Sequence, residues 1–219
     1  MNAKTRNIVA LIAQAVVVIA TVICVARFFY AGGEGNMQVV GVTCFRYFTI
    51  DSNVLAALAC AVCMVYEIRA LLAAKRSGGE VAEPVLPHWA LILAFAGTVA
   101  VTLTFMVCIS FLGPLFGYGF LFSGSNFFLH GLTPALCVFA FMALLRGRIR
   151  LVECFWCLLP VLLYGIVYFI MVIAIGQDAG GWPDFYAFNM GGLWPVAYVI
   201  ITVGTFVFAA IERLPHRRS

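Results

Sequence analysis

A group of polar residues stands at the start of a long apolar stretch, where such side chains are costly to bury. The group comprises Arg46, Tyr47, Thr49, Asp51, Ser52 and Asn53. On a helix, Arg46, Thr49 and Asn53 follow one another at intervals of three and four residues and share one face. A lone threonine in an apolar helix usually bonds a carbonyl of its own preceding turn. A threonine grouped with arginine, serine and asparagine is a candidate for function.

His130 is the second candidate, because it is the only histidine inside an apolar stretch. His88 borders such a stretch, and His216 lies in the tail. A single histidine within a membrane helix is more often structural than functional. However, the helices that carry Thr49 and His130 enter from the same side, so both residues lie roughly 6–8 Å below one membrane boundary. Equal depth permits a Thr–His pair.

A third group of polar and aromatic residues fills the segment 180–189, Gly-Gly-Trp-Pro-Asp-Phe-Tyr-Ala-Phe-Asn. Aromatic residues at a membrane interface are often anchors. This segment lies on the same side as the entrance to a Thr49–His130 pair. We therefore expect Asp184, Tyr186 and Asn189 to stand over the mouth of such a site.

The elements that must position these residues are membrane helices. Of the 219 residues, 64% are hydrophobic and 10% are charged, whereas soluble domains average about 45–50% and about 25%. This composition excludes a soluble globule and a disordered chain. A helix needs about 20 apolar residues to cross the hydrocarbon core. Six segments are long enough: Asn7–Tyr30, Phe45–Leu72, His88–Leu112, Ser125–Leu145, Glu153–Ile175 and Leu193–Ile211.

We therefore predict an all-α polytopic membrane protein in which residues 1–219 form a single domain of six transmembrane helices. The basic residues predict its orientation. Eleven of them lie at the termini and in the second and fourth connections, whereas only Arg27 and Arg46 lie on the other side. By the positive-inside rule, both termini are cytoplasmic.

The sequence lacks the motifs that mark phosphate-binding, metal-binding and serine-hydrolase sites. The chain has no glycine-rich phosphate loop, no cluster of metal ligands and no nucleophile elbow, so we expect no cofactor and no metal. The pairs Cys60–Cys63 and Cys154–Cys157 lie in apolar helices, where cysteine acts as a small hydrophobe. The basic residues are dispersed between apolar stretches, so we expect no nucleic-acid partner.

Three segments carry a resemblance to a known family. Residues 45–53 (Phe-Arg-Tyr-Phe-Thr-Ile-Asp-Ser-Asn), 129–134 (Leu-His-Gly-Leu-Thr-Pro) and 181–188 (Gly-Trp-Pro-Asp-Phe-Tyr-Ala-Phe) occur in this order. They resemble the bacterial six-helix relatives of the androgen-induced and androgen-dependent intramembrane hydrolases. Animal members of that family hydrolyse fatty acid esters of hydroxy fatty acids with a threonine nucleophile and a histidine.

The resemblance implies a lipid-ester hydrolase of the cell membrane, with Thr49 as nucleophile and His130 as base. Its partners are then the lipid ester and the surrounding membrane lipids, and its oligomeric state is left open. A hydroxyl needs a positioned base to become nucleophilic, and a neutral imidazole can take its proton. The oxyanion of the tetrahedral intermediate that leads to an acyl-threonine needs donors. Asn53, Ser52 or Arg46 can supply them, and Arg46 can alternatively clamp a carboxylate. The further candidates for substrate binding or oxyanion stabilisation are Asp184, Tyr186 and Asn189.

Two other classes of function remain open. A transporter or channel would use the polar cluster as a pathway, although the sequence has no pair of matching broken helices. A non-catalytic scaffold or sensor would use a Thr49–His130 hydrogen bond only to fix helix packing. Reaction with an activity probe separates an activated hydroxyl from a structural one.

The predicted orientation is open to a direct test. Single cysteines at Ser77 and Arg148 should react with a membrane-impermeant maleimide only from the cytoplasmic side. Cysteines at Gly117 and Asp184 should react only from outside, because the basic connections stay in the cytoplasm. Labelling of the Ser77 and Asp184 positions from the same side would contradict the six-span topology.

Overall fold

A computed structural model describes residues 1–32 and 40–217, apart from the side chain of Phe120. Within this part of the chain six helical segments are long and apolar enough to cross a membrane, and no strand occurs. The segments are Ala3–Ala31, Phe48–Ser77, His88–Phe116, Gly124–Leu144, Leu151–Ile175 and Trp194–Glu212. The predicted all-α architecture with six membrane helices is thereby confirmed.

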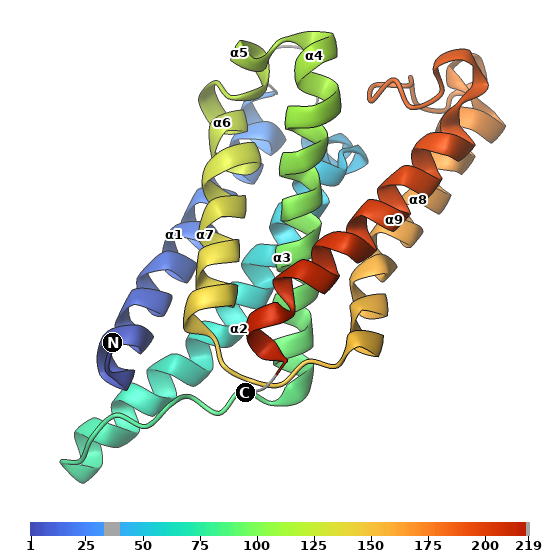
Figure 1. The fold of residues 1–219 in the computed structure, drawn as a ribbon. Coiled ribbons are helices and arrows are strands. Elements are labelled where there is room, and N and C mark those ends of the chain that lie inside the picture. Colours follow the sequence, from blue (N-terminus) through green and yellow to red (C-terminus); the bar gives the residue numbers. More distant parts are fainter. Residues whose placement is uncertain (33–39, 218–219) are drawn as a thin grey trace.

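Both ends of the chain lie at one end of the bundle, with the connections 78–87 and 145–150 (Figure 1). We call this the terminal end. The opposite end, the loop end, holds the short helices α4 (Gly113–Phe116), α5 (Tyr118–Leu121) and α6 (Gly124–Phe127), together with residues 176–193. The charge asymmetry predicts that the loop end faces outward.

The helix that carries Thr49 begins later than predicted. Residues Gly41–Arg46 form a separate 3-10 turn, η1, and α2 spans Phe48–Ser77. Tyr47 joins them in an extended conformation, with φ −99° and ψ 123°. This extended residue takes Arg46 off the helix, so the prediction that Arg46 shares a helix face with Thr49 and Asn53 is wrong.

The helix that carries His130 contains a π-helical turn. After α6 comes η3 (Phe128–Leu132), then α7 (Thr133–Phe139) and a second π turn, η4 (Ala140–Leu144). The amide of Thr133 bonds the carbonyl of Phe128, five residues back. Pro134 follows and has no N–H to donate. The wider turn, common at functional sites, thus occurs at His130 itself.

Helix α3 (His88–Val107) lies in the middle of the bundle and continues through the π turn η2 (Cys108–Leu112) into α4. Its Gly97 lies close to α2, because a Cβ on Gly97 would lie 3.0 Å from the Cα of Ala56. This approach leaves no room for a side chain at Gly97, and it fixes α2 against α3.

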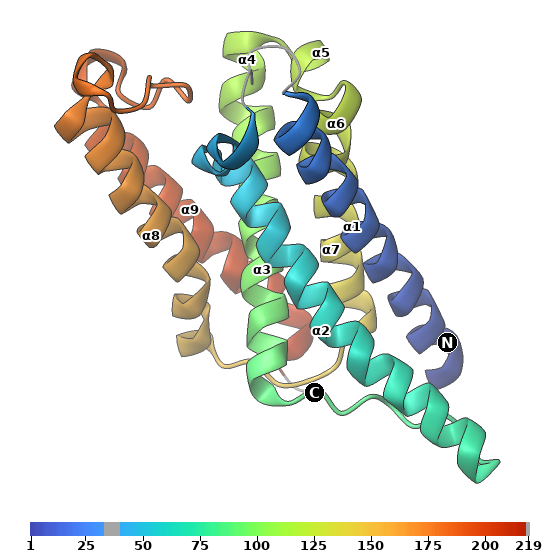
Figure 2. The same cartoon turned by 180° about the vertical axis from the view of Figure 1, so that it is seen from behind.

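The last two helical segments lean away from α1 and α7 at the loop end (Figures 1 and 2). The fifth consists of η5 (Leu151–Cys157), α8 (Leu158–Tyr168) and η6 (Phe169–Ile175), and the sixth is α9 (Trp194–Glu212). Residues 176–193, which include the short turns η7 (Gln177–Ala179) and η8 (Met190–Gly192), fold back toward the rest of the bundle. Ring centroids of Phe185 and Tyr47 are 4.5 Å apart, and those of Phe188 and Phe111 are 5.7 Å apart.

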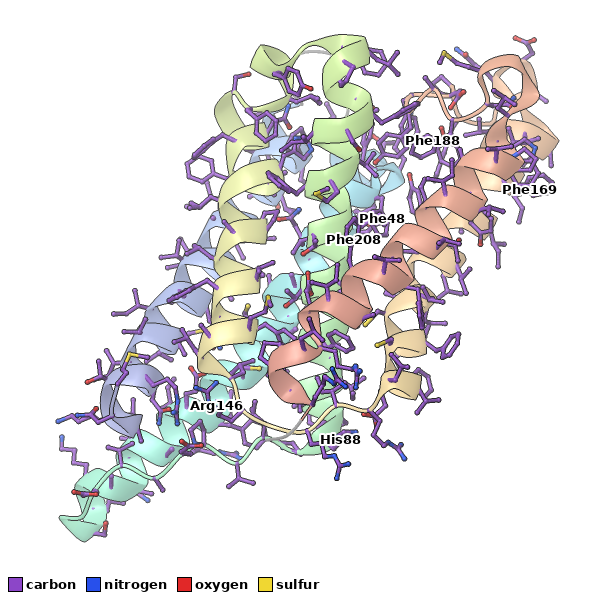
Figure 3. All side chains as sticks on the ribbon, viewed as in Figure 1. Phe48, His88, Arg146, Phe169, Phe188 and Phe208 are labelled. Atoms are coloured by element: carbon purple, nitrogen blue, oxygen red, sulfur yellow. The ribbon has the colours of Figure 1, made fainter. Side chains whose placement is uncertain are left out.

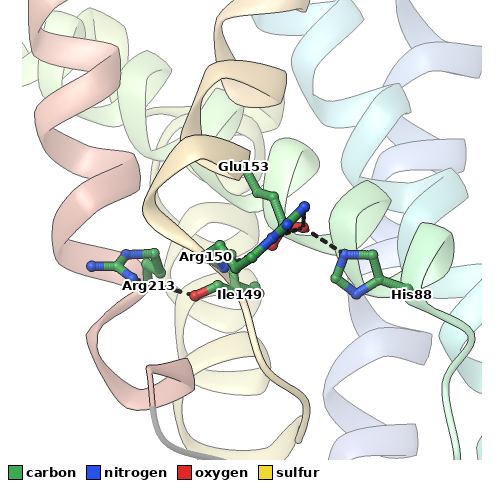
Figure 4. Close-up of polar contacts among 5 residues, drawn as sticks. All are labelled: His88, Ile149, Arg150, Glu153 and Arg213. Atoms are coloured by element: carbon green, nitrogen blue, oxygen red, sulfur yellow. Dashed lines mark hydrogen bonds and ion pairs between the residues drawn. The ribbon is translucent and has the colours of Figure 1, made fainter.

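Polar contacts hold the N-terminus of α3, the turn η5 and the end of α9 together at the terminal end (Figure 4). A carboxylate oxygen of Glu153 lies 2.9 Å from Nε2 of His88 and 3.0 Å from Arg150. The guanidinium of Arg213 donates to the carbonyl of Ile149 at 3.3 Å. His216, placed in the tail by the sequence, is buried in the final 3-10 turn, η9 (Leu214–His216), against Phe141.

The close approach of α2 and α3 predicts a large effect of substitution at Gly97. Gly97→Leu should destabilise the protein by about 1–3 kcal/mol, because the added atoms meet backbone rather than a movable side chain. Gly204→Leu on α9 is the matched control, since the nearest atom to a Cβ there is 3.9 Å away, on Phe208. Thermal unfolding in detergent measures both, and equal unfolding temperatures for the two variants would contradict the packing.

Candidate functional site

Thr49 and His130 meet inside the bundle near the loop end. Oγ1 of Thr49 lies 3.3 Å from Nε2 of His130, and both side chains are buried. The other ring nitrogen, Nδ1, lies 2.7 Å from the carbonyl oxygen of Leu121. A carbonyl only accepts hydrogen bonds, so Nδ1 carries the proton, and in a neutral imidazole Nε2 is the acceptor. The Thr49 hydroxyl therefore donates toward Nε2, which is the arrangement of a hydroxyl and its general base.

Leu121 belongs to the short helix α5, which crosses the loop end just ahead of the His130 helix. Its carbonyl orients the imidazole as a carboxylate does in many hydroxyl–histidine sites. The ring of Phe122 packs edge-on to the imidazole, with centroids 6.3 Å apart. His130 thus has a defined tautomer and a defined ring orientation.

Asn53 connects the helix of Thr49 with the helix of His130. Its Nδ2 donates to the carbonyl of Thr49 at 2.7 Å and to the carbonyl of Leu129 at 3.1 Å. The Leu129 carbonyl needs such a partner, because in the π turn the amide of Thr133 bonds Phe128 instead. Its next possible partner is residue 134, a proline without N–H. Asn53 therefore satisfies a carbonyl that the π turn and Pro134 leave unpaired.

Ser52 and Arg46 do not line the cavity at Thr49. The Ser52 hydroxyl lies 3.2 Å from the Thr49 carbonyl and 2.9 Å from Oγ1 of Thr104 on α3. The carbonyl of Arg46 accepts from the Tyr164 hydroxyl at 2.7 Å. Both hydrogens of Asn53 Nδ2 are donated to carbonyls, so Asn53 and Ser52 are engaged away from the space beside Thr49, and Arg46 is not part of its lining.

That space is a cavity of about 250 Å³ at the loop end. Its polar lining consists of Tyr47, Thr49, Asn126, His130, Asp184 and Tyr186. A smaller apolar cavity of about 50 Å³ adjoins it, since Thr49, Leu112 and Tyr186 line both. The apolar cavity is bounded by α3, α8 and α9, in the region of Phe48 and Phe188 in Figure 3. Thr49 thus lies between a polar space and an apolar one.

The segment 182–189 covers the polar cavity, as predicted for Asp184 and Tyr186. Asp184 acts within the segment: Oδ1 accepts from the Tyr168 hydroxyl at 2.5 Å and the Phe188 amide at 3.0 Å, and Oδ2 accepts from the Asn189 amide at 2.8 Å. Asn189 takes part through its backbone and does not line the cavity. The carboxylate of Asp184 is therefore a scaffold for the loop.

Tyr186 is the residue of the loop that reaches Thr49. Its side chain is buried, and burial raises the pKa of its phenol well above the usual range, an effect that the neighbouring polar groups of Thr49 only partly offset. The phenol thus stays protonated around neutral pH and is available as a donor.

Sequence reasoning missed Asn126 and the carbonyl of Leu121. Asn126 lines the cavity and is buried, and its spacing of four residues before His130 was a usable signal. Nothing in the sequence indicated the contact between the Leu121 carbonyl and His130, because every residue has a backbone carbonyl whatever its side chain. Among the described residues no group of three or more histidine, cysteine, aspartate or glutamate side chains is arranged to hold a metal ion.

The bridge through Asn53 predicts a specific loss of stability. Asn53→Leu keeps the volume but leaves the Leu129 carbonyl unpaired, which should cost about 1–3 kcal/mol. Asn7→Leu is the control, because Asn7 is also buried but makes one weaker bond, 3.4 Å to the carbonyl of Ala82. Thermal unfolding should rank Asn53→Leu below Asn7→Leu, and the reverse order would refute the bridge.

Comparisons with protein-family models, with curated proteins and with solved structures give no match to this chain. The resemblance to intramembrane hydrolases therefore stands on the sequence segments alone. What the chain does must be inferred from the geometry and chemistry of the Thr49–His130 site.

Proposed function

We propose that this protein is an intramembrane hydrolase of lipid esters, with Thr49 as nucleophile and His130 as general base. The observation that carries the proposal is the hydrogen-bonded series from Thr49 Oγ1 to His130 Nε2 at 3.3 Å and from His130 Nδ1 to the Leu121 carbonyl at 2.7 Å. A contact that served only helix packing would not require a cavity beside the hydroxyl. Here a cavity of about 250 Å³ opens at both side chains.

The reaction follows from these positions. Thr49 Oγ1 attacks the carbonyl carbon of the ester while its proton moves to His130 Nε2, and the carbonyl electron pair moves onto oxygen. When the tetrahedral intermediate collapses, the bond to the alcohol oxygen breaks and His130 protonates that oxygen. Water then attacks the acyl-threonine, His130 takes one of its protons, and a carboxylic acid leaves as Thr49 recovers its hydrogen.

The two cavities support a lipid ester as the substrate. The apolar cavity suits an acyl chain, because methylene groups lose no hydrogen bonds there and leave water behind. The polar cavity suits the alcohol portion and the attacking water. Fatty acid esters of hydroxy fatty acids, which the resemblance implies, have this division into an apolar chain and a polar junction. With the predicted orientation, such a substrate enters from the outer leaflet.

Substitution of the pair tests the proposal. Thr49→Ala, Thr49→Val and His130→Ala should each lower ester hydrolysis by at least about a hundredfold, since acid–base catalysis supplies about 10²–10⁴. The Thr49→Ala/His130→Ala double variant should be scarcely worse than either single variant, because members of one catalytic unit fail together. Thr49→Ser should keep partial activity because it keeps a hydroxyl.

Purified variants are assayed with 4-nitrophenyl esters of short and long fatty acids and with fatty acid esters of hydroxy fatty acids. Fluorophosphonate labelling at Thr49 provides a second readout. Thr98→Val is the matched control, because Thr98 is buried on α3 and donates only to its own helix, to the carbonyl of Ala94 at 2.8 Å. Hydrolysis by Thr49→Val at the wild-type rate would reject Thr49 as the nucleophile.

A further inference from the structure

The hydroxyl of Tyr186 is a buried donor with no hydrogen-bond partner among the described residues. The side chain is 8% exposed and lines both cavities at Thr49. The phenol lies beside the hydroxyl and the backbone amide of Thr49 and beside the hydroxyl of Tyr164, without hydrogen-bond geometry to any of them. Leaving such a group unpaired costs about 1–3 kcal/mol, so its position calls for a reason.

A second donor, the backbone amide of Thr49, lies next to the Tyr186 phenol. Thr49 is the second residue of α2, and Tyr47 is its N-cap. The first amides of a helix have no carbonyl of a preceding turn to bond, and the positive end of the helix dipole lies there. The amides of Ile50 and Asp51 bond the Tyr47 carbonyl. The Thr49 amide precedes them and lies at the nucleophile itself.

The segment that holds Tyr186 is fixed in place. Its ring packs against the rings of Tyr168 and Phe188, with centroids 5.9 Å and 5.1 Å away. Asp184 accepts three hydrogen bonds that shape the turn around it. The next residue, Ala187, adopts a φ of +57°, a conformation that residues other than glycine rarely take. Such strain persists only where the surrounding structure imposes it.

We propose that the Tyr186 hydroxyl and the Thr49 backbone amide together form the oxyanion hole of this site. As Thr49 Oγ1 bonds to the ester carbon, the carbonyl oxygen gains the electron pair and accepts hydrogen bonds from both groups. When the intermediate collapses, the pair returns to the carbon–oxygen bond, and neither donor loses its proton. Fixed donors in a site shielded from water stabilise developing charge without reorganising. The inference rests on the proposed hydrolase function and identifies a further catalytic residue for it.

Tyr186→Phe tests the inference, because it removes one oxygen and keeps the ring. Loss of one oxyanion donor should lower kcat about 10²–10³-fold with KM changed less than about threefold. The affinity for a trifluoromethyl ketone analogue of the ester, which forms a tetrahedral adduct, should fall by a similar factor. The unfolding temperature should equal or exceed that of the wild type, since an unpaired hydroxyl leaves the interior.

Tyr198→Phe is the matched control. Its hydroxyl contacts the carbonyl of Leu162 at 3.5 Å, away from both cavities, so kcat should stay within about twofold of the wild type. A Tyr186→Phe protein with wild-type kcat, or one that loses activity only through unfolding at a lower temperature, overturns the oxyanion assignment alone. A wild-type protein that neither hydrolyses any of the esters nor reacts with fluorophosphonate overturns the proposed function, and the assignment with it.

Discussion

The amide of Asn53 donates to one carbonyl beside the candidate nucleophile and to another beside the candidate base, so a single side chain sets the spacing of the site. In the hydrocarbon core an unpaired carbonyl costs several kcal/mol, because no water is present to bond it. The π turn and Pro134 leave the carbonyl of Leu129 without a backbone hydrogen bond. The side-chain amide of Asn53, on the neighbouring helix, donates one to it. This hydrogen bond joins α2 to the His130 helix at the level where Thr49 and His130 meet.

The surroundings of His130 differ from those of the other two histidines. His88 faces the carboxylate of Glu153, and the ring nitrogens of His216 face the carbonyls of Gly147 and Phe141. Both contact sets join helices at the terminal end of the bundle. One nitrogen of His130 is likewise bound to a carbonyl, but its other nitrogen faces a hydroxyl at a cavity. A fixed tautomer and an acceptor nitrogen at a cavity are what the proposed role of general base requires.

Helices α8 and α9, which lean away from the rest of the bundle at the loop end, bound one side of the apolar cavity beside Thr49. If these helices packed along the bundle at the loop end, side chains from α3 and α9 would close the space beside Thr49. Instead the aromatic segment 185–188 fills the opening and brings Tyr186 to the N-terminus of α2. The loop covers the cavity, and in the proposed mechanism it supplies the Tyr186 hydroxyl as a donor. Exclusion of water from such a site would strengthen the electrostatic interactions inside it, because the local dielectric constant falls.

Hydrophobicity alone determined the six membrane helices of this protein, because the length of an apolar stretch is a local property of the chain and the bilayer sets the required length. The sequence also identified Thr49 and His130, since polar residues at membrane depth are rare and their depth follows from helical rise. It could not determine which donors face the cavity. Asn53 and Ser52 have the right types and spacing, yet Asn53 donates to the carbonyl of Leu129 on the neighbouring helix, and the Ser52 hydroxyl contacts the Thr49 carbonyl of its own helix and the hydroxyl of Thr104. The approach of Tyr186 to Thr49 and the packing of Phe185 on Tyr47, where the helix breaks, join segments far apart in the chain. The contact of the Leu121 carbonyl with His130 depends on how the short connection between them folds. Only the tertiary structure decided these features, because a hydrogen bond is satisfied by whichever partner the fold brings within reach.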